Sequence, residues 1–220
     1  MKAIVPKTPR YGLPKTGQTY AYAADDDGAL QKGYPLTGER FTDNGNNTLT
    51  DNATGLMWIK SGRAIGTVGA YNWIASAYSV TEWNWSTALL AIAALNANNY
   101  QGHNDWRMPN IIEMQSLINF GSYPGKDGSI SSPFSWSPVN YPWMCWTSTT
   151  AARAYTPTAY VIMTGTTGSG ERGGLLGFTS EVTIYREDRG GSWTYYTTSP
   201  YSPGAKVAHK HLAIPCRGPD

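Results

Sequence analysis

The chain has 220 residues, a formal net charge of +2 and only 15% charged residues. A chain of this length buries about 70% of its unfolded surface when it folds as one globular domain. Its lysines and arginines form no run, which argues against a nucleic-acid partner, since phosphate contacts need a concentrated basic face. The 24 glycines, 9 tryptophans and 15 tyrosines instead predict short strands joined by many turns.

The N-terminal segment differs in composition from the rest of the chain. Residues 1–40 contain four prolines and the turn-like sequence Asp25-Asp26-Asp27-Gly28, with little apolar periodicity. We expect an extended N-terminal arm over residues 1–40, held in an ordered conformation, and one domain over residues 41–220. No apolar stretch resembles a secretory signal or a membrane span. We therefore expect no membrane insertion, and either a mature fragment, an intracellular protein or a component released by another route.

Short strands linked by Asx and glycine turns are expected after Arg40. The strand-like segments are 41–42, 48–50 and 56–60, and the turn sequences are 43–47 and 51–55. Four side chains of these turns also resemble the oxygen ligands of a calcium loop, although the closing glutamate of an EF-hand is missing. They are Asp43, Asn46, Asn47 and Asp51. Ordinary hairpin turns are the favoured alternative, and we expect no other cofactor.

Two helices are expected in the middle of the chain. The first covers residues 84–97, because its apolar residues recur at helical spacing. The second covers about 110–119, where Asn110 is a strong N-cap and Glu113 completes a capping box. Later strands are predicted at 143–149, 159–164, 177–185, 192–197 and 206–215. This order predicts an α+β fold in which two helices pack on short, mainly antiparallel strands.

The segment Asp105-Trp106-Arg107-Met108-Pro109-Asn110 combines a helix start with a candidate ion pair. Arg107 is flanked by apolar residues, so we expect a half-buried guanidinium paired with Glu113 or Asp105. A structural pair that locks the helix to a sheet is favoured over a catalytic pair. The residues expected to be structural are Trp58, Trp85, Trp106, Arg107, Asn110 and Glu113.

The cysteines and histidines show no spacing that is typical of a catalytic or zinc site. Cys145 and Cys216 form either one disulfide or two buried free thiols. His209 and His211 alternate along a predicted strand, where ordinary strand histidines are favoured over a metal pair. The glycine-rich sequence 165–174 lacks the ending of a phosphate-binding loop, which favours a flexible loop.

An aromatic and basic cluster in the C-terminal third is the main candidate binding surface. Exposed rings there would stack on sugar faces, and the basic groups would bind hydroxyls, carboxylates or sulfates. The alternative is an aromatic core between strands, because alternation along a strand buries about half of its rings. The candidate ligand-binding residues are Tyr185, Arg186, Arg189, Trp193, Tyr195, Tyr196 and Lys210.

Several of these sequences resemble one known family. Thr54-Gly55-Leu56-Met57-Trp58, Asp105-Trp106-Arg107-Met108-Pro109-Asn110 and Glu113 resemble the Lcl C-terminal domain family, also called domain of unknown function 1566. The resemblance covers roughly residues 12–150. Trp146-Thr147-Ser148-Thr149 and Cys216-Arg217-Gly218 are similar to later family segments, whereas residues 165–205 are longer and more divergent.

The resemblance implies a C-type-lectin-like fold, related to that of formylglycine-generating enzymes. It also implies a non-enzymatic binding module at a cell or virion surface, because the best-known member is the tip domain of a trimeric bacterial adhesin that binds sulfated polysaccharides. A glycan or cell-surface receptor as partner, a homo-oligomer and an extracellular or virion location follow as expectations. Ile92 stands where many members have a helix cysteine, so Cys145 becomes the replacement partner of Cys216.

Two other functions remain open. In the first, the chain is a structural or assembly subunit of a virion or an extracellular filament, and its N-terminal arm docks on a neighbouring subunit. In the second and less favoured one, it is an enzyme similar to formylglycine-generating enzymes. That chemistry resembles a paired-cysteine copper site, and no supporting ligand pattern accompanies Cys145 and Cys216.

Overall fold

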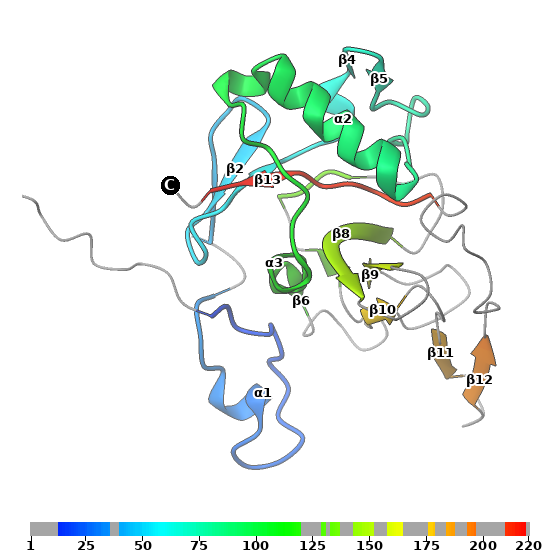
Figure 1. Cartoon of the computed structure of the whole chain (residues 1–220). Helices are drawn as coiled ribbons and strands as arrows, with labels where there is room; N and C mark the ends of the chain where they lie inside the picture. Colours follow the sequence, from blue (N-terminus) through cyan, green and yellow to red (C-terminus); the bar gives the residue numbers. More distant parts are fainter. Residues whose placement is uncertain are drawn as a thin grey trace, which may run out of the picture.

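The computed structural model describes residues 13–35, 40–119, 129–130, 133–136, 143–151, 158–164, 176–178, 184–187, 193–196 and 210–218. For residues 129–130, 143–144, 151 and the strands between 158 and 196, only the backbone is described. The fold is α+β with antiparallel strand pairing, as the element order predicted (Figure 1). None of the described helices is long and apolar enough to cross a membrane.

The first sheet joins the beginning of the domain to its end. β1 (Phe41–Asp43), β2 (Thr48–Asp51) and β3 (Met57–Ile59) form an antiparallel meander, and β13 (Cys216–Arg217) pairs with β3. The three predicted strands of this region are confirmed. Their positions follow from local turn sequences, which is why the sequence pattern locates them well.

The two predicted helices are present, but the second is shorter than expected. α2 (Trp85–Ala97) begins after the N-cap Asn84, whose side chain accepts a hydrogen bond from the Thr87 backbone N–H at 2.8 Å. α3 (Ile111–Ser116) ends three residues before the predicted end at 119. Buried Arg40 donates to the Ser116 carbonyl at 2.9 Å, and the chain then enters β6 (Ile118–Asn119). A distant side chain therefore takes a carbonyl at the helix end.

Several short elements complete the domain. They are the 3-10 turns η1 (Arg63–Ile65) and η2 (Tyr100–Gly102), the hairpin of β4 (Thr67–Val68) and β5 (Tyr71–Asn72), and β7 (Ser129–Ile130), which pairs with β6. The second larger sheet has the order β10 (Leu176–Phe178), β9 (Thr158–Thr164), β8 (Trp143–Ala151). β11 (Ile184–Glu187) pairs with β12 (Trp193–Tyr196). The single strand predicted at 177–185 is thus two strands, because β10 and β11 have different partners.

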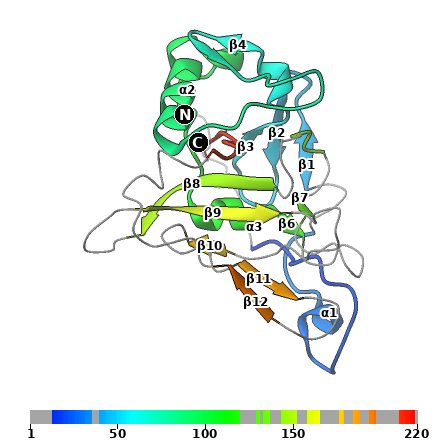
Figure 2. The ribbon, with the colours of Figure 1, turned by 90° about the vertical axis from the view of Figure 1, so that its right-hand side faces the viewer.

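The terminal segment 210–218 runs through the middle of the core. Both ribbon views place it between α2 and β8 (Figures 1 and 2). Leu212, Ala213, Ile214 and Cys216 are fully buried, so the segment is surrounded by the rest of the domain. Among the described residues, the largest core side chains are wholly buried indoles, contributed by Trp58, Trp73, Trp106, Trp136 and Trp146.

The described part of the N-terminal arm, residues 13–35, folds back on itself. Lys15 N–H donates to the Tyr34 carbonyl at 2.6 Å, and Tyr34 N–H donates to the Leu13 carbonyl at 2.9 Å. The Asp25–Gly28 sequence is the start of a short helix, α1 (Asp27–Leu30), instead of a simple turn. Asp26 caps this helix and also accepts from the backbone N–H groups of residues 22 and 23.

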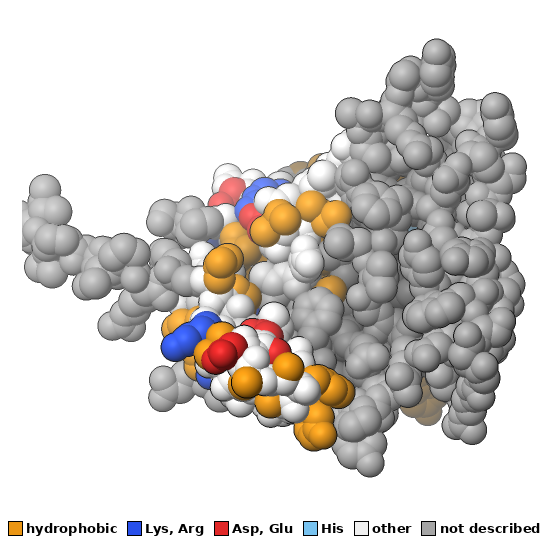
Figure 3. Space-filling model, turned by 90° about the horizontal axis from the view of Figure 1, so that it is seen from below, with side chains coloured by type: hydrophobic (Ala, Val, Ile, Leu, Met, Phe, Trp, Pro, Cys, Tyr) orange, Lys and Arg blue, Asp and Glu red, His pale blue; other side chains and the backbone are white. Residues whose placement is uncertain are grey.

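The outer surface of the arm is apolar at several positions. Leu13 is 85% exposed, Tyr20 67% and Tyr22 81%, and the two tyrosine rings meet edge to face with centroids 4.7 Å apart. Hydrophobic side chains are visible on this side of the molecule (Figure 3). The backbone beneath Tyr20 is tightly packed, because a Cβ atom at Gly28 would lie 2.0 Å from the Tyr20 carbonyl oxygen.

A buried ion pair connects the first sheet to α3. The Arg40 and Asp51 side chains are both fully buried, with Nη2 2.8 Å from Oδ2 and Nε 3.1 Å from Oδ1. Asp51 also accepts from the Ala53 backbone N–H at 2.9 Å. Removal of one member of such a pair destabilises the fold strongly, because the charge of the other member stays buried without a partner.

We expect Arg40→Met to lower the free energy of unfolding by about 3–5 kcal/mol, because it leaves the Asp51 carboxylate buried without a cation. The matched control is Lys60→Met, which breaks the partly exposed Lys60–Asp43 pair of the same sheet and should cost much less. Urea unfolding of both variants measures the difference. Equal losses would contradict a special role for the buried pair.

Candidate functional site

An open cavity of about 460 Å³ lies beside the Arg107 segment, between α2, the start of α3 and β8. Pockets that bind small molecules have volumes of roughly 300–1,000 Å³, so the cavity is large enough for a ligand. Its apolar wall comes from the α2 residues Leu89, Ile92 and Ala93. Its polar side is formed by Arg107, Asn110, Glu113 and Ser148.

The Arg107–Glu113 ion pair is the charged element of this cavity. Nη1 and Nη2 of Arg107 each lie 2.7 Å from a Glu113 carboxylate oxygen, and Nη2 also donates to the Gly218 carbonyl at 3.1 Å. The Arg107 side chain is 40% exposed and that of Glu113 18%. The half-buried guanidinium and its pairing with Glu113 are therefore as predicted. Asp105 pairs instead with Arg217, at 2.7 Å.

Glu113 also holds the start of α3. Its carboxylate accepts from the Asn110 backbone N–H at 2.8 Å, while the Asn110 side chain accepts from the Glu113 backbone N–H at 2.9 Å. This is the capping box that the sequence predicted. One carboxylate thus fixes both the helix and the guanidinium, which gives the polar side of the cavity a defined geometry.

Both members of the pair are charged at neutral pH. The hydrogen bonds to Glu113 raise the pKa of Arg107 above its usual value. Burial raises the pKa of Glu113, but the hydrogen bonds from Arg107 and from the Asn110 N–H outweigh it and leave the pKa below its usual value. Neither group titrates near neutral pH. Such a pair is suited to holding a ligand and poorly suited to general acid–base catalysis, which needs a pKa near the working pH.

The backbone around the cavity is fixed by distant parts of the chain. Arg107 and Cys216 exchange two backbone hydrogen bonds, of 2.8 and 3.0 Å, which tie the segment to the terminal strand. The side chain of Asn96, in the last turns of α2, accepts a hydrogen bond from the Trp106 backbone N–H at 2.7 Å and donates one to the Trp106 carbonyl at 2.8 Å. The sequence gives no sign of this role of Asn96, because no spacing rule marks a helical asparagine that pairs with a distant backbone.

The three tryptophans predicted to be structural are buried in the core or hydrogen-bonded to a backbone carbonyl of another segment. Trp58 and Trp106 are buried, and the Trp106 indole N–H donates to the Tyr100 carbonyl at 3.0 Å. Trp85 is the first residue of α2, and its indole N–H donates to the Thr147 carbonyl of β8 at 3.0 Å. Trp106 is the one of these three that also lines the cavity.

The four candidate calcium ligands do not form a common oxygen cage. Asp51 is buried against Arg40, whereas Asp43 pairs with Lys60 near the surface. Asn47 bonds the backbone of Ser61, and Asn46 accepts from the Thr48 hydroxyl. Among the described residues, no group of three or more His, Cys, Asp or Glu side chains is placed to hold a metal ion. Each of the four side chains has a partner of its own within the protein, which fits the favoured alternative of ordinary hairpin turns.

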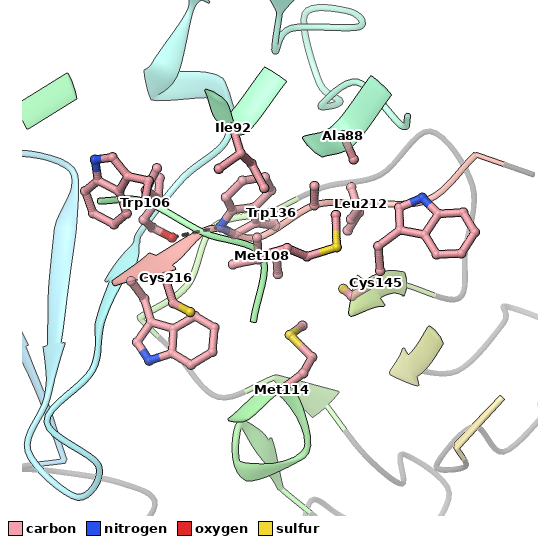
Figure 4. Packing of buried hydrophobic residues seen from close by; sticks show 14 of the residues in the cluster. Ala88, Ile92, Trp106, Met108, Met114, Trp136, Cys145, Leu212 and Cys216 are labelled. Carbon is pink, nitrogen blue, oxygen red and sulfur yellow. Dashed lines mark hydrogen bonds between the residues drawn. The ribbon is translucent and has the colours of Figure 1, made fainter. Parts of the chain in front are cut away.

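The two cysteines are buried free thiols, which is one of the two alternatives that the sequence left open, and the Cys145–Cys216 disulfide implied by the family resemblance is not formed. Cys145 lies in β8 and Cys216 in β13, and they stand well apart in the packed core (Figure 4). Burial raises the pKa of Cys145 far above its usual value and that of Cys216 to about 12. Both are therefore neutral at physiological pH, and a neutral thiol is a poor nucleophile and metal ligand.

The structure brings part of the aromatic and basic cluster together. Tyr185 and Arg186 lie in β11, and Trp193, Tyr195 and Tyr196 lie in β12. In the register of this hairpin, Tyr185 is opposite Tyr195.

The remaining predicted residues are placed only in part. The side chains of the hairpin, all of Arg189, His209 and the sequence 165–174 lie outside the described residues. Lys210 is exposed at the start of the terminal segment. His211 is 8% exposed, and its ring packs against Trp146 with centroids 4.6 Å apart.

The strands described after β8 join the core in two ways. β9 pairs antiparallel with β8 and β10 with β9, whereas β11 and β12, in the described part of the chain, pair only with each other. The terminal segment then returns to β8, where Cys145 and Leu212 form a parallel bridge and Trp146 N–H donates to the Leu212 carbonyl at 2.8 Å.

Comparison with known proteins identifies one family. The model of the family described as the Lcl C-terminal domain matches residues 47–176, which is 130 of the 220 residues. The matched region includes α2, the Arg107 segment, α3 and β8, and thus all the residues that line the cavity. No curated protein and no solved structure matches the chain.

The lowered pKa of Glu113 predicts a pH-dependent contribution to stability. This contribution is complete above the pKa of Glu in the unfolded chain, about 4.3, and is lost as the pH falls through the lower folded-state pKa. Glu113→Gln keeps a residue that completes a capping box but removes the charge. We expect the stability gap between wild type and variant to be full near neutral pH and to shrink below a pH of about 4. Urea unfolding at a series of pH values measures it, and a constant gap would contradict the assignment.

Proposed function

We propose that this chain, which belongs to the Lcl C-terminal domain family, is a non-enzymatic module that binds a glycan or a receptor at a cell or virion surface. The observation that carries the proposal is the preformed cavity at Arg107, with its fixed ion pair and its apolar α2 wall. We also propose that the fold is C-type-lectin-like. Two helices beside short antiparallel strands, and a last strand that returns next to β3, support this assignment.

The chemistry of the described residues supports binding over catalysis. Arg107 and Glu113 are both charged at neutral pH and are already hydrogen-bonded to each other. Cys145 and Cys216, the residues on which a formylglycine-generating activity would depend, are buried neutral thiols. A site with a fixed geometry and a stable charge state serves recognition of a ligand without bond making or breaking.

The β11–β12 hairpin and its flanking residues provide a second surface for the same function. In the described part of the chain the two strands pair only with each other, so their side chains can vary with little effect on the two larger sheets. We propose that the aromatic and basic residues of and around this hairpin contact a glycan or a receptor, and that oligomerisation multiplies weak individual contacts. The backbone pairing of Tyr185 with Tyr195 supports a common platform for these residues.

A large side chain placed in the cavity tests whether the cavity is the binding site. Ala93 is exposed on α2 and lines the cavity, whereas Leu90, on the same helix and 57% exposed, lies outside its lining. We expect Ala93→Trp to weaken binding to glycan arrays and to cells by at least about tenfold, which corresponds to about 1.4 kcal/mol. Leu90→Trp is the matched control and should bind like wild type. Equal binding by both variants, or no binding by the wild-type oligomer, would contradict the proposal.

One observation favours the alternative function of an assembly subunit. The arm is ordered by its own hydrogen bonds yet exposes Leu13, Tyr20 and Tyr22. A segment of this size is too small to bury an apolar core by itself. Large apolar side chains that remain exposed on an ordered segment are typical of a surface that contacts another molecule.

We expect deletion of residues 1–35 to lower the oligomeric state while the domain stays folded, because the deletion removes this apolar surface. The finer variant replaces Tyr20 and Tyr22 with serine, which keeps the backbone bonds of residues 22 and 23 to Asp26. Sedimentation velocity measures the mass, and circular dichroism checks the fold. An unchanged mass for both variants would exclude the arm as an assembly element.

A further inference from the structure

The Arg107 cavity is balanced in charge. Among the residues that line it, Arg107 and Glu113 are the two charged ones, and they neutralise each other through paired hydrogen bonds of 2.7 Å. An anionic ligand would meet a guanidinium whose charge is already compensated, next to the negative Glu113. A cationic ligand would meet Arg107. The electrostatic environment therefore favours a ligand group without net charge.

The remaining hydrogen-bonding capacity is mixed. A guanidinium has five N–H groups, and the described contacts of Arg107 use three of them. A carboxylate has about four acceptor positions, and the described contacts of Glu113 also use three. The pair thus retains two guanidinium donors and one carboxylate acceptor position. A carboxylate or sulfate only accepts and an ammonium only donates, whereas a hydroxyl does both.

The contacts of the pair leave its free positions on different atoms. Gly218 takes the second N–H of Nη2 and the Asn110 N–H takes the second position of Oε2, so the free positions are on Nε and Nη1 of Arg107 and on Oε1 of Glu113. Ser148 and Asn110, both exposed, stand on the same polar side. Opposite them, Leu89, Ile92 and Ala93 offer an apolar wall to the C–H groups of a ring.

We infer that the cavity binds a neutral sugar, or a similar polyol, whose hydroxyls contact the free positions of Arg107 and Glu113. This inference rests on the proposed binding function and names its ligand chemistry. The hydroxyl oxygens accept from the free guanidinium N–H groups, and a hydroxyl hydrogen is donated to the Glu113 carboxylate. The ring packs on the α2 wall. Anionic sugars of the same size are disfavoured at this site.

The test uses the full chain and two sets of probes. The neutral set is the methyl glycosides of glucose, mannose and galactose, and the anionic set is glucuronic acid and glucose 6-sulfate. Nuclear magnetic resonance follows the Arg107 Nε–H and Trp106 indole N–H signals during titration, with Trp85 as an indole outside the cavity. We expect neutral glycosides to shift the Arg107 and Trp106 signals in wild type and in Leu90→Trp but not in Ala93→Trp.

The charge balance is tested separately with Glu113→Gln, which leaves Arg107 uncompensated and keeps a capping-box residue. We expect the ratio of affinities for glucose 6-sulfate and methyl glucoside to rise at least about tenfold in this variant. Circular dichroism checks the fold of this variant. If Glu113→Gln does not fold, Arg107→Lys takes its place: it loses the planar fork of the guanidinium and should weaken the binding of neutral glycosides.

The outcomes distinguish a failure of this inference from a failure of the proposed function. Tighter binding of anionic than of neutral sugars by wild type would overturn the inference and leave the proposed function standing. No shift at Arg107 with any probe would also overturn it. If, in addition, Ala93→Trp binds glycan arrays and cells like wild type, the cavity is not the binding site and the proposed function fails as well.

Discussion

The structure depends on the burial of its terminal segment in the middle of the core. His211 pairs with Trp83, Leu212 with β8, Pro215 with β3, and Cys216 with both β3 and Arg107. A buried backbone has to satisfy its polar groups, and this segment does so with several different neighbours. It therefore joins the two larger sheets and the Arg107 segment, and the domain is complete only when the end of the chain has been placed.

This arrangement makes the cavity a product of contacts that are distant in sequence. Arg107 is held through its backbone by Cys216 and through its guanidinium by Gly218, 111 residues further along the chain. Asn96 and Ser148 position the segment from α2 and β8. Each of these bonds ties the polar side of the cavity to an element with a separate role in the core. The site is consequently preorganised, which lowers the entropic cost of binding.

The sequence predicted those features that local chemistry determines. The strands between residues 40 and 60, the helix after Asn84 and the capping box at Asn110 all follow from turn residues, caps and apolar spacing within a few positions. The Arg40 side chain that bonds the last carbonyl of α3 comes from 76 residues away, and the division of 177–185 depends on two separate strand partners. Such partners are not encoded in any local pattern. The interpretation of Arg107 and Glu113 as structural was correct for their contacts but missed the cavity that they also face.

The same ion pair can serve both the scaffold and a ligand because its two roles use different atoms. Three guanidinium N–H groups hold Glu113 and the terminal strand, and two remain. A role in stability constrains this pair, so a ligand that relies on it has to match a fixed, neutral arrangement. The β11–β12 hairpin pairs with neither of the two larger sheets in the described part of the chain, so the scaffold constrains it less. Under the proposed function, recognition combines a contact held by the scaffold with contacts from this hairpin, and specificity can change in the second without loss of the first.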